Sequence, residues 1–417
     1  MKLSGTFKLA GDKSISHRIA LLSLMASGEC EVSNYSTAKD CMTSAQALNS
    51  LGGVARFSGG KLFLSSMEYR FKNGANIDCG NSGTTMRLLM GVLAAAPGKF
   101  YLTGDESLMR RPMERVAKPL REMGANISCA PSGTPPVTLQ GDELTGIDYT
   151  LPVPSAQLKS AILIAGLRAE GVTRVAEPVK SRDHTENMLK TFGADISFQS
   201  GAWCVRRSEI ELPSAFSVPG DPSSAAFFLC GAAMLRGSEV IAEGILLNPT
   251  RIKFLEKING MGVRIEIEPK GESPEPWGNV MSRYSGQLSP CHITADELPL
   301  LVDEVPILAL LATQAHGVSV FQEISELRIK ESDRIAALVS ELGKMGARLQ
   351  IDGSNLIIHG PCRLKSHNSL ESFGDHRIAM TLALACGIAD AGPEIRGLSC
   401  ISISYPEFFD TMKELTS

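Results

Sequence analysis

The sequence lacks the short motifs that mark common cofactor and hydrolase sites. It contains no GxxxxGK[ST] phosphate loop, no GxGxxG after a strand, no HExxH and no GxSxG. Its ten cysteines form no close pair, since the nearest two, Cys30 and Cys41, are eleven residues apart. This spacing excludes a CxxC redox or zinc motif, so we expect buried, reduced cysteines and neither a metal nor a cofactor.

Long apolar runs are also missing. No run approaches the about 18 residues of a membrane helix, and the N-terminus MKLSGTFKLAGDKS lacks the apolar core of a signal peptide. With 41 basic and 45 acidic residues, the formal net charge is −4. Such a balance disfavours a general nucleic-acid or anionic-membrane binder. We therefore expect a cytoplasmic protein that binds neither nucleic acid nor membranes.

The chain of 417 residues repeats itself. Apolar, helix-like segments recur and each stops at a glycine, with intervals of 70, 73, 66, 80 and 70 residues between the stops. Because these segments are apolar on nearly every face, we expect helices that are buried all round, with the glycine as C-terminal cap. The six glycines are Gly28, Gly98, Gly171, Gly237, Gly317 and Gly387.

A second unit alternates with the first. It consists of an amphipathic helix, a turn with glycine and a short β-branched strand, as in LREMGANISC and LVSELGKMGARLQI. The glycines at 52, 124, 193, 262 and 346 are 72, 69, 69 and 84 residues apart. Two helix types thus share a period near 70, which predicts six small α/β units, three on each side of the Pro/Ser-rich stretch near 212–224.

The starts of the apolar helices carry small polar residues and cations. A helix N-terminus attracts anions through its free N–H groups and its dipole. A cation there is unfavourable unless an anion lies nearby, and Lys13, Arg18, Arg87, Lys159 and Arg377 all stand within a turn of such a start. We therefore expect a site for a small molecule with more than one anionic group.

Two further basic clusters belong to this pattern. Arg110 and Arg111 precede a proline and are expected on a loop that enters a helix. Lys330 and Arg334 are spaced to share one helical face, with Glu331 between them. Together with Asp303 and other carboxylates, these residues indicate transfer chemistry on a polyanionic small molecule without naming it.

Eight segments carry a resemblance to a known family. They occur in the order GDKSISHR, GNSGTTMRLLMG, RRPM, VPSAQLKSAILIAGL, SRDHTENM, VPGDPSSAAFFL, LRIKESDR and DHRIAM. In this order they resemble the 5-enolpyruvylshikimate-3-phosphate synthases. The resemblance implies an α/β fold of two domains, each with three βαβαββ-type repeats, in a pseudo-sixfold, inverse α/β barrel-like architecture. One domain would be residues 14–217 and the other 1–13 plus 218–417, with the active site in the cleft between them.

The resemblance also implies a reaction. The family joins phosphoenolpyruvate to the 5-hydroxyl of shikimate 3-phosphate through a tetrahedral intermediate and releases phosphate, in aromatic amino-acid biosynthesis. Its members are usually monomeric, and glyphosate binds them in place of phosphoenolpyruvate.

The resemblance assigns roles residue by residue. The catalytic residues would be Lys13, Asp303 as the base, Glu331 as the acid and His376 as a supporting group. Phosphoenolpyruvate would contact Lys13, Gly83, Arg111, Gln157, Arg334 and Arg377. Shikimate 3-phosphate would contact Ser14, Arg18, Ser155, Ala156, Gln157, Arg182, Asp303 and Lys330.

Three positions depart from the pattern of many members. Ala156 replaces a serine, Glu326 an asparagine and Ile403 a lysine, traits that resemble a divergent subclass. Two other functions stay open: transfer of the same enolpyruvyl group to UDP-N-acetylglucosamine, and a non-catalytic anion-binding protein on this fold. Ser14 in place of an asparagine, and no cysteine in 101–120, disfavour the first.

Overall fold

The chain forms two compact units in a computed structural model that describes residues 1–65, 69–367, 369–389 and 395–416. The continuous unit is Gly11–Val218. The discontinuous unit combines Met1–Ala10 with Pro219–Ser417. The chain passes from the first to the second at Val218, within the Pro/Ser-rich stretch of the sequence.

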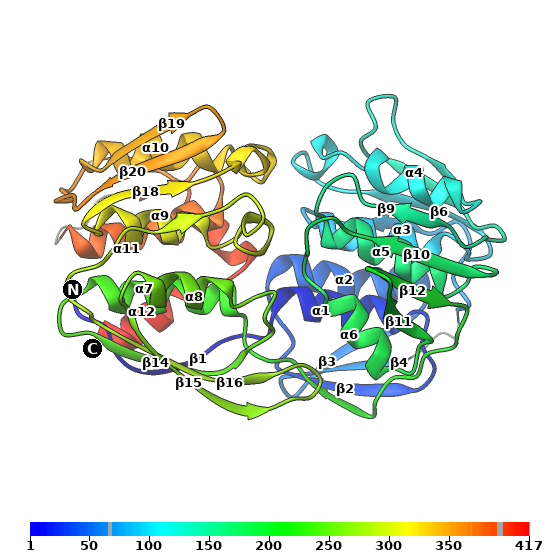
Figure 1. Ribbon diagram of the computed structural model, residues 1–417. Coiled ribbons are helices and arrows are strands. Elements are labelled where there is room, and N and C mark those ends of the chain that lie inside the picture. Colours follow the sequence, from blue (N-terminus) through cyan, green and yellow to red (C-terminus); the bar gives the residue numbers. More distant parts are fainter. Residues whose placement is uncertain (66–68, 368, 390–394, 417) are drawn as a thin grey trace. The chain divides into compact units, whose positions relative to one another are not determined.

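The continuous unit runs from blue to green in Figure 1. Its helices are α1 (Lys13–Leu22), α2 (Lys39–Leu51), α3 (Gly83–Leu93), η1 (Leu108–Arg110), α4 (Glu114–Glu122), α5 (Ala156–Gly166) and α6 (His184–Thr191). Its strands are β2 (Glu29–Ser33), β3 (Val54–Ser58), β4 (Lys61–Ser65), β5 (Asn76–Asp78), β6 (Lys99–Thr103), β7 (Asn126–Ser128), β8 (Val137–Gln140), β9 (Asp148–Thr150), β10 (Val172–Ala176), β11 (Ile196–Gln199), β12 (Ala202–Arg206) and β13 (Ala215–Ser217).

Three sheets of this unit share one topology. Their strand orders are β13-β2-β4-β3, β5-β6-β8-β7 and β9-β10-β12-β11, and in each the first pair is parallel and the others are antiparallel. The first repeat takes its parallel strand from the far end of the unit, where Ala215 pairs with Glu31. The chain therefore closes the unit on itself, and the predicted βαβαββ repeat is confirmed here three times.

The discontinuous unit is built from the same repeat. Its helices are α7 (Pro222–Met234), α8 (Lys253–Gly260), η2 (Leu298–Leu300), α9 (Val305–Thr313), η3 (Ile324–Ile329), α10 (Arg334–Lys344), α11 (His376–Ile388), η4 (Leu398–Ile403) and α12 (Phe408–Thr416). Its strands are β1 (Ser4–Lys8), β14 (Glu239–Leu246), β15 (Arg264–Gly271), β16 (Trp277–Arg283), β17 (His292–Ile293), β18 (Gly317–Phe321), β19 (Arg348–Asp352), β20 (Asn355–Gly360), β21 (Leu370–Glu371) and β22 (Ile395–Arg396).

Two of its three sheets repeat the four-stranded pattern, as β1-β14-β16-β15 and β17-β18-β20-β19. Strand β1 pairs in parallel with β14, which ties the first ten residues of the chain to this unit. The third repeat differs, because its described part has only the pair β21 and β22, followed by η4 and α12. The sheets stay separate and none closes into a barrel among the described residues, while the predicted α/β fold is confirmed.

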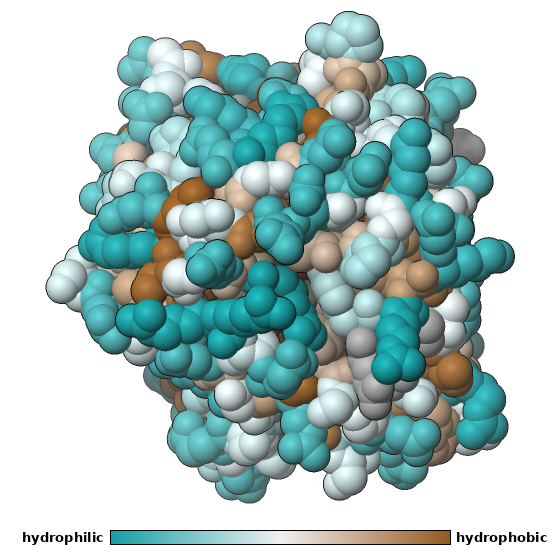
Figure 2. Space-filling model, turned by 90° about the vertical axis from the view of Figure 1, so that its right-hand side faces the viewer, coloured by the Kyte–Doolittle hydropathy of each residue, from teal (hydrophilic) through white to brown (hydrophobic). Residues whose placement is uncertain are grey.

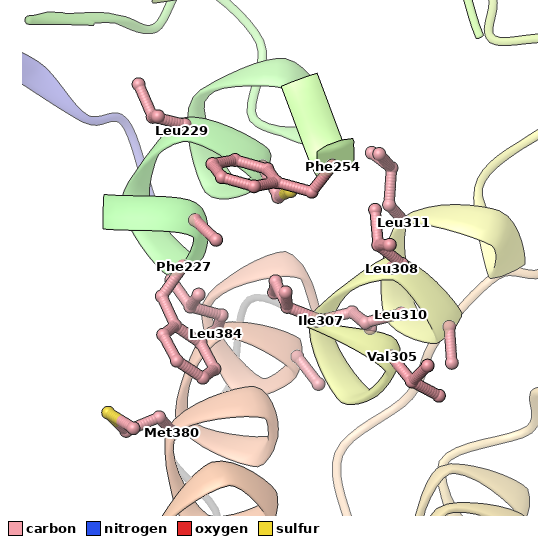
Figure 3. Close-up of a cluster of buried hydrophobic side chains, with 14 of the residues drawn as sticks. Phe227, Leu229, Phe254, Val305, Ile307, Leu308, Leu310, Leu311, Met380 and Leu384 are labelled. Carbon is pink, nitrogen blue, oxygen red and sulfur yellow. The ribbon is translucent and has the colours of Figure 1, made fainter. Parts of the chain in front are cut away.

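The apolar helices form the interior of each unit, as their sequences predict. In the discontinuous unit, α7, α9 and α11 lie between the two four-stranded sheets (Figure 1). Figure 3 shows side chains from α7, α8, α9 and α11 gathered in one cluster, among them Phe227, Phe254, Ile307, Leu308 and Leu384. All of these are essentially inaccessible to solvent. Helices with no polar face are stable here because they are covered on every side.

The two sets of glycines play different parts. Those after the amphipathic helices cap them: Gly124 follows α4 with φ of +109°, and the next amide, of Ala125, donates to Leu120 O. The other prediction was wrong. Gly98 and Gly171 lie several residues beyond the ends of α3 and α5 and directly precede strands, while Gly387 lies inside α11. A few further residues therefore separate α3 and α5 from the strands that follow them, β6 and β10.

All ten cysteines are free, and all except Cys129 and Cys204 are buried.

Figure 2 shows a face on which hydrophilic residues predominate and hydrophobic ones form small separate patches. In the described part of the chain, no helix combines the length and the hydrophobicity needed to cross a membrane.

Candidate active site

The buried helices begin where the sequence predicts. Ser82, Ser155, Asp221 and Asp375 each accept a hydrogen bond from a backbone N–H of the first turn, on α3, α5, α7 and α11. Asp12 does the same for α1. Capping therefore explains the small polar residues, and the charged residues next to them need a separate account.

In the continuous unit, Gln157 links two of these helix starts. Its Oε1 accepts a hydrogen bond from Arg87 Nη1 at 2.5 Å, and its Nε2 donates to Thr84 Oγ1 at 2.8 Å. Arg87 is largely buried and also donates to the carbonyl of Pro112. The starts of α3 and α5 are therefore held together by side chains as well as by packing.

Gly83 makes room for two guanidinium groups at the same place. A Cβ atom at this position would lie 3.1 Å from Arg87 Nη1 and 3.4 Å from Arg111 Nη1. Arg111 lies between η1 and α4, as predicted, and donates to Asn81 Oδ1 at 2.9 Å, whereas Arg110 is the last residue of η1 rather than part of a loop. The first turn of α3 thus faces two cations, which is an arrangement suited to a bound anion.

Helix α1 contributes Lys13, Ser14 and Arg18. Lys13 Nζ lies 2.8 Å from Asp40 Oδ2, on α2. Arg18 is 3% exposed and donates to the carbonyl of Ser14 at 2.9 Å. Arg18 also donates to the hydroxyl groups of Thr185 and Ser160, at 2.7 and 3.0 Å. Arg18 is consequently fixed in direction by three different helices.

Next to these cations lies a neutral histidine. Burial lowers the pKa of His17 from 6.5 to about 3, and Asp40 only partly offsets this effect. Its Nδ1 is 2.8 Å from Ser44 Oγ, which in turn is 2.8 Å from Thr85 Oγ1 on α3. The neutral ring thereby joins α1 to α3 through α2 without adding charge.

The other residues of this unit that are expected to contact a substrate lie at or just before helix starts. Ser155 caps α5, Ala156 is its first residue, and both are half-buried. Arg182 lies in the segment between β10 and α6 and is half-buried as well. The continuous unit therefore contains Lys13, Ser14, Arg18, Gly83, Arg111, Ser155, Ala156, Gln157 and Arg182.

In the discontinuous unit the charges gather around Arg334. Its side chain is 1% exposed, and its guanidinium lies 2.8 Å from Asp375 Oδ2, 2.7 Å from Glu331 Oε2 and 3.5 Å from Asp303 Oδ1. Burial by itself would lower the pKa of Arg334, but the three carboxylates outweigh it and raise that pKa above its ordinary value. The group stays positively charged and orients all three carboxylates.

Arg377, on α11, binds Asp303 in the same cluster. Its Nε lies 3.1 Å from Asp303 Oδ1, and its Nη1 donates to the carbonyl of Asp303 at 3.0 Å. His376, the first residue of α11, is buried. Asp303 and Glu331 keep 22% and 24% of their side chains exposed, so a ligand can reach both carboxylates.

Two expectations need correction. Lys330 and Arg334 do not share a helical face, because Asp333 accepts from the amides of Ile335 and Ala336 and so starts α10 at Arg334. Lys330 precedes this cap and instead donates to Glu326 at 2.8 Å. The second correction concerns Lys159, whose balancing anions are Glu177 and Glu186, each 2.7 Å away, rather than a ligand.

The sequence did not reveal which residues orient the expected ones. Asp375 both caps α11 and binds Arg334, and Asp40 pairs with Lys13 across a separation of 27 residues. Ile403, where a lysine is common, packs partly buried against the core at the end of η4. Among the described residues, no group of three or more His, Cys, Asp or Glu side chains is arranged to hold a metal ion.

Comparison with known proteins decides the family. The family model for EPSP synthase (3-phosphoshikimate 1-carboxyvinyltransferase) matches residues 1–412. The chain belongs to the EPSP synthase family. It is 40% identical over 418 aligned residues to the 3-phosphoshikimate 1-carboxyvinyltransferase of Bacillus subtilis, covering 99% of this chain and 97% of that one.

Solved structures of the family and of its fold agree with this result. EPSP synthase from Acinetobacter baumannii superposes with a TM-score of 0.88 at 36% identity, with 99% of this chain and 96% of the other covered. The enolpyruvyl transferase NikO from Streptomyces tendae matches with a TM-score of 0.81 over 100% of this chain and 95% of the other. Its identity is 18%, so it supports the fold alone.

Proposed function

We propose that this member of the EPSP synthase family transfers the enolpyruvyl group of phosphoenolpyruvate to the 5-hydroxyl of shikimate 3-phosphate. The observation that supports it best is the cluster in which Arg334 holds Asp303 and Glu331 on one guanidinium. Addition to an enol needs a base and an acid at the same place, and these two carboxylates are partly exposed.

The reaction proceeds in two balanced steps. In the addition, Asp303 takes the proton of the 5-hydroxyl, whose oxygen bonds to C2 of phosphoenolpyruvate, and Glu331 delivers a proton to the methylene carbon. In the elimination, Glu331 takes a proton back from the new methyl group as the C2–O bond to phosphate breaks. The C–H electron pair restores the double bond, and phosphate leaves with the proton that Asp303 holds. Arg334 keeps both carboxylates in place throughout, and His376, at the start of α11, is a supporting polar group.

The cations hold the two substrates. Phosphoenolpyruvate carries a carboxylate and a phosphate, which suit Lys13, Arg111, Arg334 and Arg377, with the backbone at Gly83 and the amide of Gln157 beside them. Shikimate 3-phosphate contacts Ser14, Arg18, Ser155, Gln157, Arg182, Asp303 and Lys330, together with the free N–H of Ala156 at the start of α5. The proposed reaction therefore draws on residues of both units.

A phosphate-release assay tests the proposal. The wild-type protein should release phosphate from phosphoenolpyruvate when shikimate 3-phosphate is present and none when UDP-N-acetylglucosamine replaces it. Asp303→Asn should lower turnover by about 10²-fold or more, as expected for loss of a general base. Asp296→Asn, at an exposed aspartate of the same segment, is the matched control and should not change turnover. Release only with the UDP sugar, or with neither acceptor, would refute the proposal.

A further inference from the structure

A buried ion cluster joins the starts of α5 and α6. Lys159 Nζ lies 2.7 Å from Glu177 Oε1 and 2.7 Å from Glu186 Oε1. The side chains of Lys159 and Glu186 are 0% exposed, and that of Glu177 is 9% exposed. Two carboxylates and one ammonium group are thus removed from water within one small volume.

Such a cluster is a poor way to stabilise a fold. The desolvation of buried charges commonly offsets their attraction, and well-packed hydrophobic residues often serve stability as well or better. Burial lowers the pKa of Lys159, but the two carboxylates more than compensate and raise it, so the ammonium group stays charged. Burial also raises the pKa of Glu186, and the ammonium group of Lys159 opposes that rise. Charged, hydrogen-bonded groups fix the orientation of their partner side chains, which hydrophobic residues do not do.

The ion cluster also orients the segment that carries Arg182. The second oxygen of Glu177, Oε2, accepts hydrogen bonds from Ser181 Oγ at 2.6 Å and from Ser181 N at 3.1 Å. Ser181 is 3% exposed and immediately precedes Arg182. The turn after β10 is therefore anchored from inside at the residue next to Arg182.

A parallel link reaches Arg18. Ser160 and Thr185, the neighbours of Lys159 and Glu186 in the chain, lie 2.6 Å apart through their hydroxyl oxygens. Both hydroxyl groups accept from Arg18, at 3.0 and 2.7 Å. Adjacent residue pairs on α5 and α6 thus form two cross-links side by side, one ionic and one made of hydroxyl groups.

We infer that Lys159 is a positioning residue for substrate specificity: through Glu177 and Ser181 it aims Arg182, and through Glu186 it holds the helix start whose Thr185 orients Arg18. The recognised group is the phosphate of shikimate 3-phosphate, so this inference rests on the proposed function. Lys159 itself contacts no substrate. Its loss should weaken recognition of the phosphorylated substrate and spare phosphoenolpyruvate.

The test measures the Michaelis constants of both substrates for three variants. Lys159→Met should raise the constant for shikimate 3-phosphate at least tenfold and that for phosphoenolpyruvate less than twofold. Because Lys159→Met leaves two carboxylates unpaired and can impair folding, Lys159→Met/Glu186→Gln removes one of these charges and should recover thermal stability without recovering affinity for shikimate 3-phosphate. Ser181→Ala, which keeps the ion cluster, should raise the same constant about threefold.

A matched control and a second ligand separate positioning from general damage. Arg168 lies just past the other end of α5 and pairs with Glu209 at 2.6 Å, so Arg168→Met removes an ion pair from the far end of this helix, outside the cluster. It should change neither constant by more than twofold. Shikimate, which lacks the phosphate, should bind equally well to wild type and Lys159→Met in a calorimetric titration.

The outcomes are distinct. Equal losses for both substrates, or an unchanged constant for shikimate 3-phosphate in folded Lys159→Met, would overturn the positioning role. Weaker binding of shikimate in parallel with shikimate 3-phosphate would also overturn it, because the effect would not involve the phosphate. Absence of phosphate release by the wild type would instead overturn the proposed function itself.

Discussion

Replacing Gly83 by alanine adds one methyl group in front of two cations. The new Cβ would lie 3.1 Å from Arg87 Nη1 and 3.4 Å from Arg111 Nη1, closer than ordinary van der Waals contact at the first of these. No backbone atom is among its near neighbours, so the fold itself can accept the change. Alanine is also the better helix former, so the melting temperature should stay within about 2 °C of wild type.

The cost should instead appear in ligand binding. Arg87 Nη1 is tied to Gln157 Oε1 at 2.5 Å and cannot retreat without losing that bond. A misplaced methyl group in a packed site costs about 1–3 kcal/mol, and each 1.4 kcal/mol is about tenfold in affinity. Glyphosate is longer than phosphoenolpyruvate and has less room to shift. Gly83→Ala should therefore raise the glyphosate inhibition constant at least tenfold, with a smaller rise in the Michaelis constant for phosphoenolpyruvate.

The assay is a pair of inhibition curves, for wild type and Gly83→Ala, at fixed shikimate 3-phosphate. Gly91→Ala is the steric control on the same helix, because its Cβ would lie 2.4 Å from the carbonyl oxygen of Ala161. That variant should lose several degrees of melting temperature, since overpacking costs about 1–3 kcal/mol. Superimposable inhibition curves for wild type and Gly83→Ala would refute the placement of Gly83 at the inhibitor.

Three further changes test other parts of the structure. Glu331→Gln keeps an oxygen for the bond to Arg334 but cannot donate the same proton, so turnover should fall by about 10²-fold or more. Calorimetry should show unchanged binding of shikimate 3-phosphate. Near-normal turnover would remove Glu331 from the mechanism. The pKa of His17 is about 3 in the folded protein and 6.5 in the unfolded chain, so between these pH values the unfolded state binds one proton more. The contribution of His17 to the free energy of unfolding is therefore fully present above pH 6.5 and is lost as the pH falls toward 3. Denaturant titrations should show a loss of about 2 kcal/mol between pH 7 and pH 5 that is absent in His17→Asn, and equal pH slopes in the two proteins would contradict this. Gly343→Ala places a methyl group on α10 where no atom lies within 4 Å, so it should raise the free energy of unfolding by about 0.5–1 kcal/mol, and a decrease would show that this turn is strained.

The sequence by itself determined the repeat and the starts of its buried helices. Both are local properties: apolar periodicity is set by neighbours along one helix, and a capping bond joins residues two or three apart, as from Asp375 to the amide of Arg377. The glycines after the amphipathic helices were readable for the same reason, because the left-handed turn at Gly124 depends on that residue and the few before it. The family followed from eight segments in order, and the roles taken over from it stay predictions, as does the oligomeric state.

Only the tertiary structure decided which charges meet. Arg334 and Asp375 are 41 residues apart, and Lys13 and Asp40 are 27 residues apart, so no local pattern pairs them. The same holds for Lys159, where the sequence indicated a ligand and packing of α5 against α6 supplied two carboxylates instead. At Lys330 two local rules competed, helical spacing and the cap at Asp333, and the cap prevailed because it satisfies two amides that would otherwise lack partners. Long-range pairing depends on how buried helices pack, and that choice is made by the whole core rather than by any one segment.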